Sequence, residues 1–388
     1  MKFETKAIRI QTTQTKEREH STPIFPTSSF TFENAEQMQA VFASEEKGNI
    51  YSRFTNPSVR EFEEKIAALE GVEKAMATAS GMAAVFASIL SFLKNGDHLI
   101  ASKAVFGSTF QVIKDSLPDY GIEFSLVDPN DYTTWQDAVK DNSKMLLIES
   151  PSNPGLKIMD LNWISEFCKK NDLFFNIDNC FATPYLQNPA KFGADIITHS
   201  ATKFIDGQGR VLGGVVAGSN ENITKVLQFI RRTGASLSPF NAWILSKSLE
   251  TLAVRMDRHC DNAMTLALFL KDHEQVSMVN YPFLKDHPDY ELAKKQMRKG
   301  GGVVTFKIKD GNNQQGIKFL NKLELLSLTA NLGDARSIAS HPSSTTHRKL
   351  DDLEKRELGI TDSLIRISVG LEHIDDIIQD IDQALKAL

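Results

Sequence analysis

The sequence predicts an α/β protein with a mainly parallel sheet, followed by a smaller α/β domain toward the C-terminus. Short apolar runs rich in β-branched and aromatic residues recur between residues 74 and 217. Amphipathic stretches with helical periodicity lie between most of these runs, which indicates βαβ units with both faces of the sheet covered. The 388 residues are 41% hydrophobic and 24% charged, a balance typical of one large or two ordinary globular domains.

Seven strands are expected in the first sheet, each an apolar run that ends in polar or small residues. The helical stretches 82–93 and 161–171 carry apolar residues at intervals of three and four, as a helix against a sheet requires. The expected strands are 74–78, 98–101, 123–127, 145–149, 173–177, 195–199 and 211–217.

The last third of the chain predicts a long helix at 248–273, a glycine-rich strand at 300–308 and a final strand at 364–369. A C-terminal helix is indicated by a stripe of apolar residues at i, i+3, i+4, i+7 and i+11. That stripe consists of Ile374, Ile377, Ile378, Ile381 and Leu385.

Three parts are therefore expected. Residues 1–50 are polar and poor in strand signals, with Pro23 and Pro26, which indicates an extended arm over about 1–55. A large domain over 56–247 and a small C-terminal domain over 248–388 follow.

Charge and cysteine content exclude several classes of protein. The net charge is −5 with a pI near 6.0 and no basic stripe, so nucleic acid is not an expected partner. No stretch is long and apolar enough for a membrane span or a secretory leader, and a cytoplasmic location is expected. Cys168, Cys180 and Cys260 form no C-x-x-C spacing, and His341 and His347 are not spaced as a helical metal pair, so no metal site is expected.

Polar groups gather at the carboxyl ends of four expected strands. They are Ser80-Gly81-Met82, residues 149–154, Asp178-Asn179 and residues 199–203. Function in an open parallel sheet concentrates where these ends meet, so we expect the four segments to share one crevice.

Two of these segments suit a phosphate. Ser80-Gly81 opens a helix and would offer free backbone N–H groups, to which Ser200 and Thr202 could add hydroxyl donors. Serine and glycine are also common as purely structural helix caps, so neither segment is specific alone.

Asp178 and Lys203 make the set more specific. A carboxylate at the end of an apolar run is costly unless it meets a cation, which could be a protonated heterocyclic nitrogen or, alternatively, an internal salt bridge or a helix N-terminus. Lys203 could form a Schiff base with an aldehyde cofactor, although a lone lysine after a strand is usually solvent-exposed. Aspartate, lysine and phosphate donors together are the components of a pyridoxal-phosphate site.

Competing cofactor motifs are absent. The glycines of 207–214 do not match G-x-G-x-x-G, and no P-loop occurs. Arg366, on the last expected strand, is either a fork for a substrate carboxylate or a surface arginine.

Six motifs, in order, make the chain resemble the Cys/Met-metabolism family of pyridoxal-phosphate enzymes. The resemblance extends from about residue 20 to the C-terminus, and it implies a fold-type I enzyme that forms a homotetramer of two close dimers, with each active site at a dimer interface. The motifs are IYSRFTNPS (50–58), ASGMAA (79–84), ESPSNP (149–154), DNCFATP (178–184), HSATK (199–203) and HPSSTTH (341–347).

The resemblance also implies roles for individual residues. Lys203 would be the Schiff-base lysine and proton carrier, Asp178 would pair with the pyridine nitrogen, and Arg366 would bind the substrate α-carboxylate. Further implied cofactor contacts are Asn153 with the ring hydroxyl, Gly81, Met82, Ser200 and Thr202 with the phosphate, and Tyr51 and Arg53 with the phosphate of the neighbouring subunit.

Two positions depart from the family pattern. Phe106 stands where many members have a tyrosine that stacks on the cofactor and assists proton transfer; phenylalanine can stack but cannot donate a proton. Asn331 stands where many members have a serine near the substrate carboxylate.

With the motifs around 206–214 and 331–347, these departures resemble the O-succinylhomoserine sulfhydrylase branch. The implied reaction is γ-replacement on an O-succinyl- or O-acetylhomoserine with sulfide, which gives homocysteine in methionine biosynthesis. Cystathionine γ-synthase, with cysteine as the nucleophile, and cystathionine or methionine γ-lyase remain as alternatives.

Overall fold

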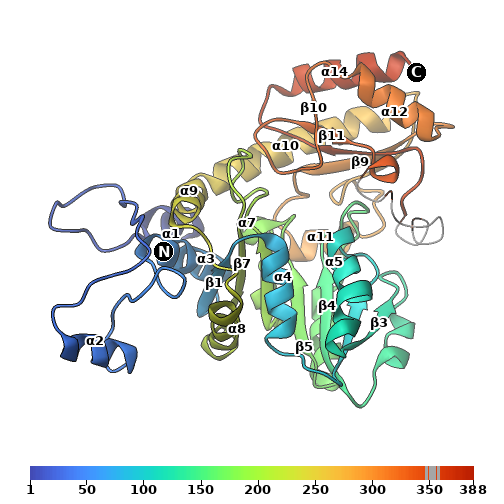
Figure 1. The fold of residues 1–388 in the computed structure, drawn as a ribbon. Helices are drawn as coiled ribbons and strands as arrows, with labels where there is room; N and C mark the ends of the chain where they lie inside the picture. Colours follow the sequence, from blue (N-terminus) through green and yellow to red (C-terminus); the bar gives the residue numbers. More distant parts are fainter. Residues whose placement is uncertain (346–347, 349–354, 356–358) are drawn as a thin grey trace.

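The computed structural model describes residues 1–345, 348, 355 and 359–388, and its centre is a seven-stranded sheet (Figure 1). The strand order is β1-β7-β6-β5-β4-β2-β3. β7 is antiparallel to both its neighbours, so the other six strands run in one direction. The α/β class and the mainly parallel seven-stranded sheet predicted from sequence are confirmed.

All seven predicted strands are present, with ends displaced by no more than three residues. β7 starts later than expected, because residues 211–213 precede the paired part of the strand. The strands are β1 (Lys74–Thr78), β2 (His98–Ser102), β3 (Glu123–Val127), β4 (Ser143–Glu149), β5 (Phe174–Asp178), β6 (Ile196–Ser200) and β7 (Gly214–Gly218).

Both faces of the sheet are covered, as a parallel sheet requires. On β4, Leu146 and Ile148 pack in the cluster that includes α3 (Pro57–Glu70) and α6 (Leu161–Lys170), whereas Met145 and Leu147 pack in a cluster on the other face. The remaining helices of this half are α4 (Gly81–Leu90), α5 (Gly107–Gln111), α7 (Thr183–Leu186), α8 (Asn220–Thr233) and α9 (Pro239–Leu249).

A second sheet forms the smaller C-terminal unit, in the order β10-β11-β12-β9-β8 (Figure 1). Three of its strands had no clear sequence signal: β8 (Val276–Asn280) is partly exposed, and β10 (Ser327–Leu328) and β11 (Ile338–Ser340) are very short. The other elements are β9 (Val303–Ile308), β12 (Leu364–Ser368), α11 (Tyr290–Gln296), α12 (Asn313–Lys322) and α14 (Ile374–Lys386).

The long helix expected at 248–273 is divided. α9 ends at Leu249, and α10 (Leu252–Lys271) begins after Glu250 and Thr251. The carbonyl of Ser248 accepts from Arg255 Nη2 at 2.9 Å and from Thr251 Oγ1 at 3.3 Å. Such side-chain hydrogen bonds compete with the helical ladder, which accounts for the break.

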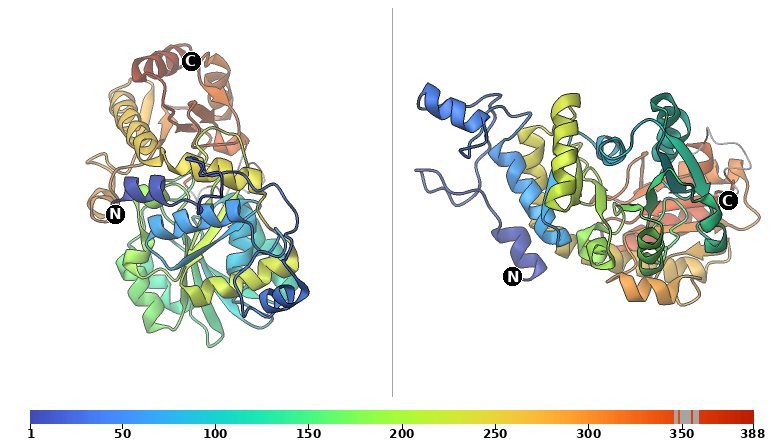
Figure 2. Two further views of the ribbon diagram at one scale, coloured as in Figure 1. Left: turned by 90° about the vertical axis from the view of Figure 1, so that its left-hand side faces the viewer. Right: turned by 90° about the horizontal axis from the view of Figure 1, so that it is seen from below.

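The N-terminal arm is less irregular than expected. α1 (Phe3–Arg9) lies on the body, where the Phe3 ring meets Tyr185 edge-on at 5.1 Å between centroids. α2 (Ala35–Phe42) stands apart from the sheet on extended segments (Figures 1 and 2). Its start is stabilised by Asn34, whose side chain accepts from the Gln37 N–H, a local signal that the composition of the arm conceals.

Candidate functional site

A cavity of about 220 Å³ lies at the carboxyl ends of β1, β4, β5 and β6, the edge at which function was expected. It brings together nine of the predicted site residues. They are Gly81, Met82, Phe106, Asn153, Asp178, Ser200, Thr202, Lys203 and Arg366.

The first turn of α4 packs directly on the end of β6. Ser80 is the N-cap, and its hydroxyl accepts from the Ala83 N–H at 3.1 Å. A Cβ added at Gly81 would lie 2.5 Å from Ser200 Cβ and 2.8 Å from Ser200 Cα, so only glycine permits this approach. The first-turn N–H groups of Gly81 and Met82 have no acceptor within the helix, and they lie beside the Ser200 hydroxyl in an arrangement suited to an anion.

Two carboxyl groups lie side by side at the ends of β4 and β5, since Glu149 and Asp178 are paired in the strand register. Burial raises the pKa of Asp178 to about 6, although the charge of His199 opposes this effect. Burial, followed by the negative charge of Asp178, raises the pKa of Glu149 well above its usual range. Glu149 Oε2 accepts from the Phe106 N–H at 2.6 Å. Of these two carboxyl groups, Glu149 is therefore the one that retains a proton more readily, and Asp178 is the one that ionises more readily.

Lys203 lies in the turn after β6, one residue beyond Thr202. The Thr202 hydroxyl accepts from the Gly213 N–H at 3.1 Å, which joins this turn to the segment before β7. Lys203 Nζ donates to Asn331 Oδ1 at 2.7 Å, and burial lowers the pKa of the lysine. Depletion of the ammonium form makes the amine a better nucleophile and base.

Arg366 is buried on β12, only 2% exposed, so it is not the surface arginine that was the alternative. Its Nη1 donates to Asn153 Oδ1 at 2.9 Å and its Nη2 to the Asn331 carbonyl at 3.1 Å. Its buried Nε has no partner among the described residues. A guanidinium in this setting still has capacity to bind a carboxylate.

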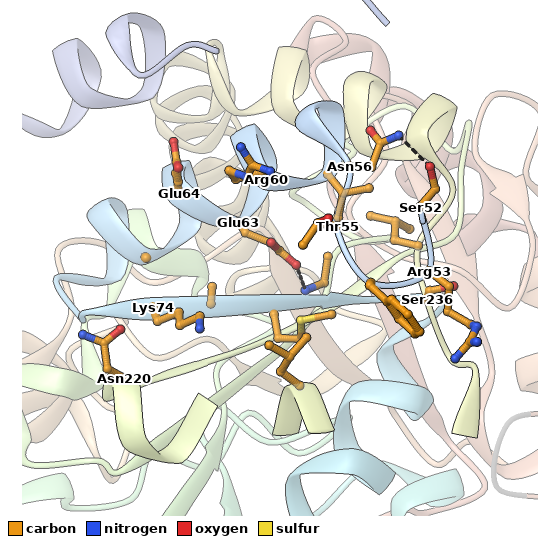
Figure 3. Close-up of a pocket in the computed structure, with 18 of the residues that line it drawn as sticks. Ser52, Arg53, Thr55, Asn56, Arg60, Glu63, Glu64, Lys74, Asn220 and Ser236 are labelled. Atoms are coloured by element: carbon orange, nitrogen blue, oxygen red, sulfur yellow. Dashed lines mark hydrogen bonds between the residues drawn. The ribbon is translucent and has the colours of Figure 1, made fainter. Parts of the chain in front are cut away.

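Tyr51 and Arg53 do not line this cavity. Tyr51 is 41% exposed, and its backbone pairs with Ser29. Arg53 lines a different cavity, between residues 52–56, α3 and the free edge of β1 (Figure 3). Its Nη1 donates to the Arg231 carbonyl. Asn331 is not part of the cavity wall but contacts Lys203, as described above.

Several lining residues had no role expected from the sequence, including Glu149, Cys180 and Leu212. Glu149 was recognisable as a polar residue at a strand end, but its pairing with Asp178 depends on the register. Cys180 is half-buried at the cavity wall. Leu212 is 61% exposed and gave no signal.

His341 is buried outside the cavity, where its ring nitrogens contact Ser344 Oγ and the Asp362 carbonyl, each at 2.8 Å. Its motif partner His347 lies outside the described residues. Within the described ranges, no three or more His, Cys, Asp or Glu side chains are placed to share a metal ion. No helix in the same part of the chain has the length and apolar character for a membrane span.

The lining fits pyridoxal phosphate on three observations. Asp178 is a desolvated carboxyl with no side-chain ion pair in the described part of the chain, a suitable partner for a protonated ring nitrogen. A lysine amine whose pKa is lowered lies in the same cavity, and the close approach of Gly81 to Ser200 brings the first-turn N–H groups of α4 beside the Ser200 hydroxyl, where a phosphate could bind.

The comparisons with known proteins agree with this reading. The model of the family described as Cys/Met metabolism PLP-dependent enzyme matches residues 4–386. An O-succinylhomoserine sulfhydrylase from Pseudomonas aeruginosa is 44% identical over all of this chain and 96% of its own. An L-methionine gamma-lyase from Fusobacterium nucleatum subsp. polymorphum is 42% identical over 94% of this chain and 93% of its own.

Among solved structures, one from Campylobacter jejuni superposes with a TM-score of 0.96 at 34% identity and full coverage of both chains. It is provisionally assigned as an O-acetylhomoserine (thiol)-lyase, and it carries N'-pyridoxyl-lysine-5'-monophosphate.

Proposed function

The chain belongs to the Cys/Met metabolism PLP-dependent enzymes, and from this premise we propose that it catalyses γ-replacement on an O-acylhomoserine, with sulfide as the nucleophile and homocysteine as the product. O-succinylhomoserine is the preferred substrate in this proposal. The name of the Pseudomonas aeruginosa relative supports it.

The single observation that carries the proposal is the phenyl ring of Phe106 in the cavity. No tyrosine is among the residues that this chain contributes to the cavity wall in the described ranges. A γ-acyloxy group leaves as a stable carboxylate and needs little acid assistance, whereas a thiolate leaving from methionine benefits from a proton donor. The cavity therefore suits an ester substrate better than a thioether.

The other lining residues would have separate roles, set by where each lies in the cavity. When bound, pyridoxal phosphate supplies an electron sink that stabilises negative charge at the substrate α-carbon. Asp178 would face the ring nitrogen, and Asn153 the ring hydroxyl. Gly81, Met82, Ser200 and Thr202 would bind the phosphate.

Lys203 Nζ would carry the protons. It would take the α-proton and later the β-proton of the substrate, and its contact with Asn331 Oδ1 would orient the amine between these transfers. Arg366 would bind the substrate α-carboxylate, with Asn153 and the Asn331 carbonyl fixing the plane of its guanidinium.

The assembly is part of the proposal. A homotetramer of two close dimers would bring Tyr51 and Arg53 of one subunit to the phosphate in the next. Neither residue lines the cavity of its own chain, and the arm projects from the body (Figure 2), both of which are consistent with this role.

The alternative that an observation favours is a methionine γ-lyase, since one such enzyme is 42% identical. Activity assays of the native holoenzyme and of the variant Phe106→Tyr distinguish the two functions. The native holoenzyme should convert O-succinylhomoserine and sulfide to homocysteine and release little methanethiol from methionine. The variant should gain methanethiol release by about tenfold, because a general acid contributes on this scale or more. Faster native turnover of methionine than of the ester would contradict the proposal.

A further inference from the structure

A buried pair of a carboxyl group and an imidazole ring lies directly behind the site. Glu70 is the last residue of α3, and its Oε1 is 2.5 Å from Nε2 of His199 on β6. Neither side chain is exposed to any extent. The roles proposed above make no use of this pair, although it is adjacent to residues that they do use.

The proposed phosphate-binding residues Gly81, Met82, Ser200 and Thr202 are called the phosphate cradle below. The strand geometry places the Glu70–His199 pair on the opposite face of the sheet from this cradle. Successive side chains of β6 alternate between the faces, so Ser200 lies toward α4 while His199 lies toward α3. Asn179, the residue after Asp178, donates from Nδ2 to Glu70 Oε1 at 3.2 Å and from its backbone to the Thr198 carbonyl at 3.0 Å. The Glu70 carboxylate thereby contacts the strand ends that carry both Asp178 and the cradle.

The charge of His199 acts on Asp178. It lowers the pKa of Asp178 against the larger effect of burial. His199 Nδ1 is buried without a hydrogen-bond partner among the described residues, so the Glu70 carboxylate is the one described group that is hydrogen-bonded to the ring. The titratable and charged groups around Asp178 and His199 are Glu149 from β4, Cys180 in the turn after β5, Glu70 from α3, and Lys203 and Arg366 on the cavity wall.

We propose that Glu70 and His199 are positioning residues: Glu70 keeps His199 in its imidazolium form, and the positive charge of His199 keeps Asp178 ionised for the ring nitrogen of the cofactor. The inference rests on the proposed placement of Asp178 opposite that nitrogen. It does not depend on the acyl group, on sulfide or on γ-replacement, so a failure of the substrate assignment leaves it untouched.

The test uses the holoenzyme and follows cofactor release after gel filtration at a series of pH values. Release should accelerate as the pH falls, because Asp178 takes up a proton and its ion pair with the ring is lost. In Glu70→Gln this acceleration should begin about one pH unit higher, since a charge near a buried carboxyl shifts its titration by at least this amount. His199→Gln should shift the profile in the same direction, and Glu70→Asp should restore part of it.

Asn176→Ala is the matched control. Asn176 is fully buried on β5, and its side chain donates to Ser88 Oγ at 2.9 Å on the α4 side of the sheet. The control should lower the Tm without moving the release profile along the pH axis. If Glu70→Gln and His199→Gln behave like this control, with a lower Tm and a native release profile, the pair is merely structural and the proposal is overturned. If Glu70→Gln does not fold, His199→Gln alone decides.

Discussion

At the scale of single residues, the site depends on one carboxyl group whose ionised form is disfavoured by its surroundings. Asp178 is desolvated and lies beside Glu149, so its charge is costly without a cationic ligand. The apolar run before Asp178 made this cost visible in the sequence. The neighbours Glu149 and His199 could not be recognised in the same way, because their contacts with Asp178 depend on strand register and on which face each side chain takes.

Asp178→Asn should stabilise the cofactor-free protein in a pH-dependent way. The pKa of Asp178 is raised to about 6 from 3.8, so the folded protein retains a proton that the unfolded chain releases. The ionised carboxylate destabilises the folded protein, and this destabilisation is absent below pH 4 and fully present above about pH 6. The variant should therefore raise the free energy of unfolding by about 3 kcal/mol at pH 7.5 and change it little at pH 4. Urea unfolding at both values measures this, and an equal effect at the two would refute the explanation.

At the scale of elements, strand periodicity was a reliable guide in the first sheet and a poor one in the second. The central strands β4 to β6 are buried on both faces and read as apolar runs. β8, β10 and β11 are short or exposed, and tertiary pairing rather than local pattern defines them. The helix break at Glu250 likewise depends on Arg255, a contact between residues that the periodicity does not reveal.

The contact between α4 and β6 predicts the effect of Gly81→Ala. Alanine is acceptable at a helix start, so the protein should fold. Its Cβ would displace Ser200, from which it would lie 2.5 Å, and would distort the phosphate cradle. Cofactor affinity should fall by about tenfold or more, equivalent to the loss of one charge-assisted hydrogen bond. Equilibrium dialysis measures this, with Ala83→Gly as a control in the same turn. Native affinity in Gly81→Ala would show that the cradle is not at this turn.

At the scale of the whole molecule, the arm is the feature that a single chain leaves unexplained. Residues 52–56 border a cavity of their own chain, while α2 projects from the body with Met38 and Phe42 about half exposed (Figure 2). The low hydrophobicity of the arm predicted its extension, whereas its helices depend on local caps and packing that composition does not express.

Complementation between inactive variants tests the proposal that subunits share a site. Lys203→Ala should abolish turnover, and Arg53→Ala should reduce it strongly if Arg53 serves a neighbouring subunit. After the two variants are unfolded and refolded together, hybrid dimers should contain one site with both native residues and should regain up to about a quarter of native activity. Each variant refolded alone is the control. If the mixture forms hybrid dimers but regains no activity, Arg53 acts in the site of its own chain or outside any site.

The most direct test of the proposed reaction offers the purified holoenzyme O-succinylhomoserine with equal concentrations of sulfide and cysteine. Mass spectrometry then identifies the products. We predict mostly homocysteine, because sulfide is the proposed nucleophile and the cavity suits an ester substrate. Mostly cystathionine would contradict it and make cysteine the nucleophile, and mostly 2-oxobutanoate would show that γ-elimination is the principal reaction.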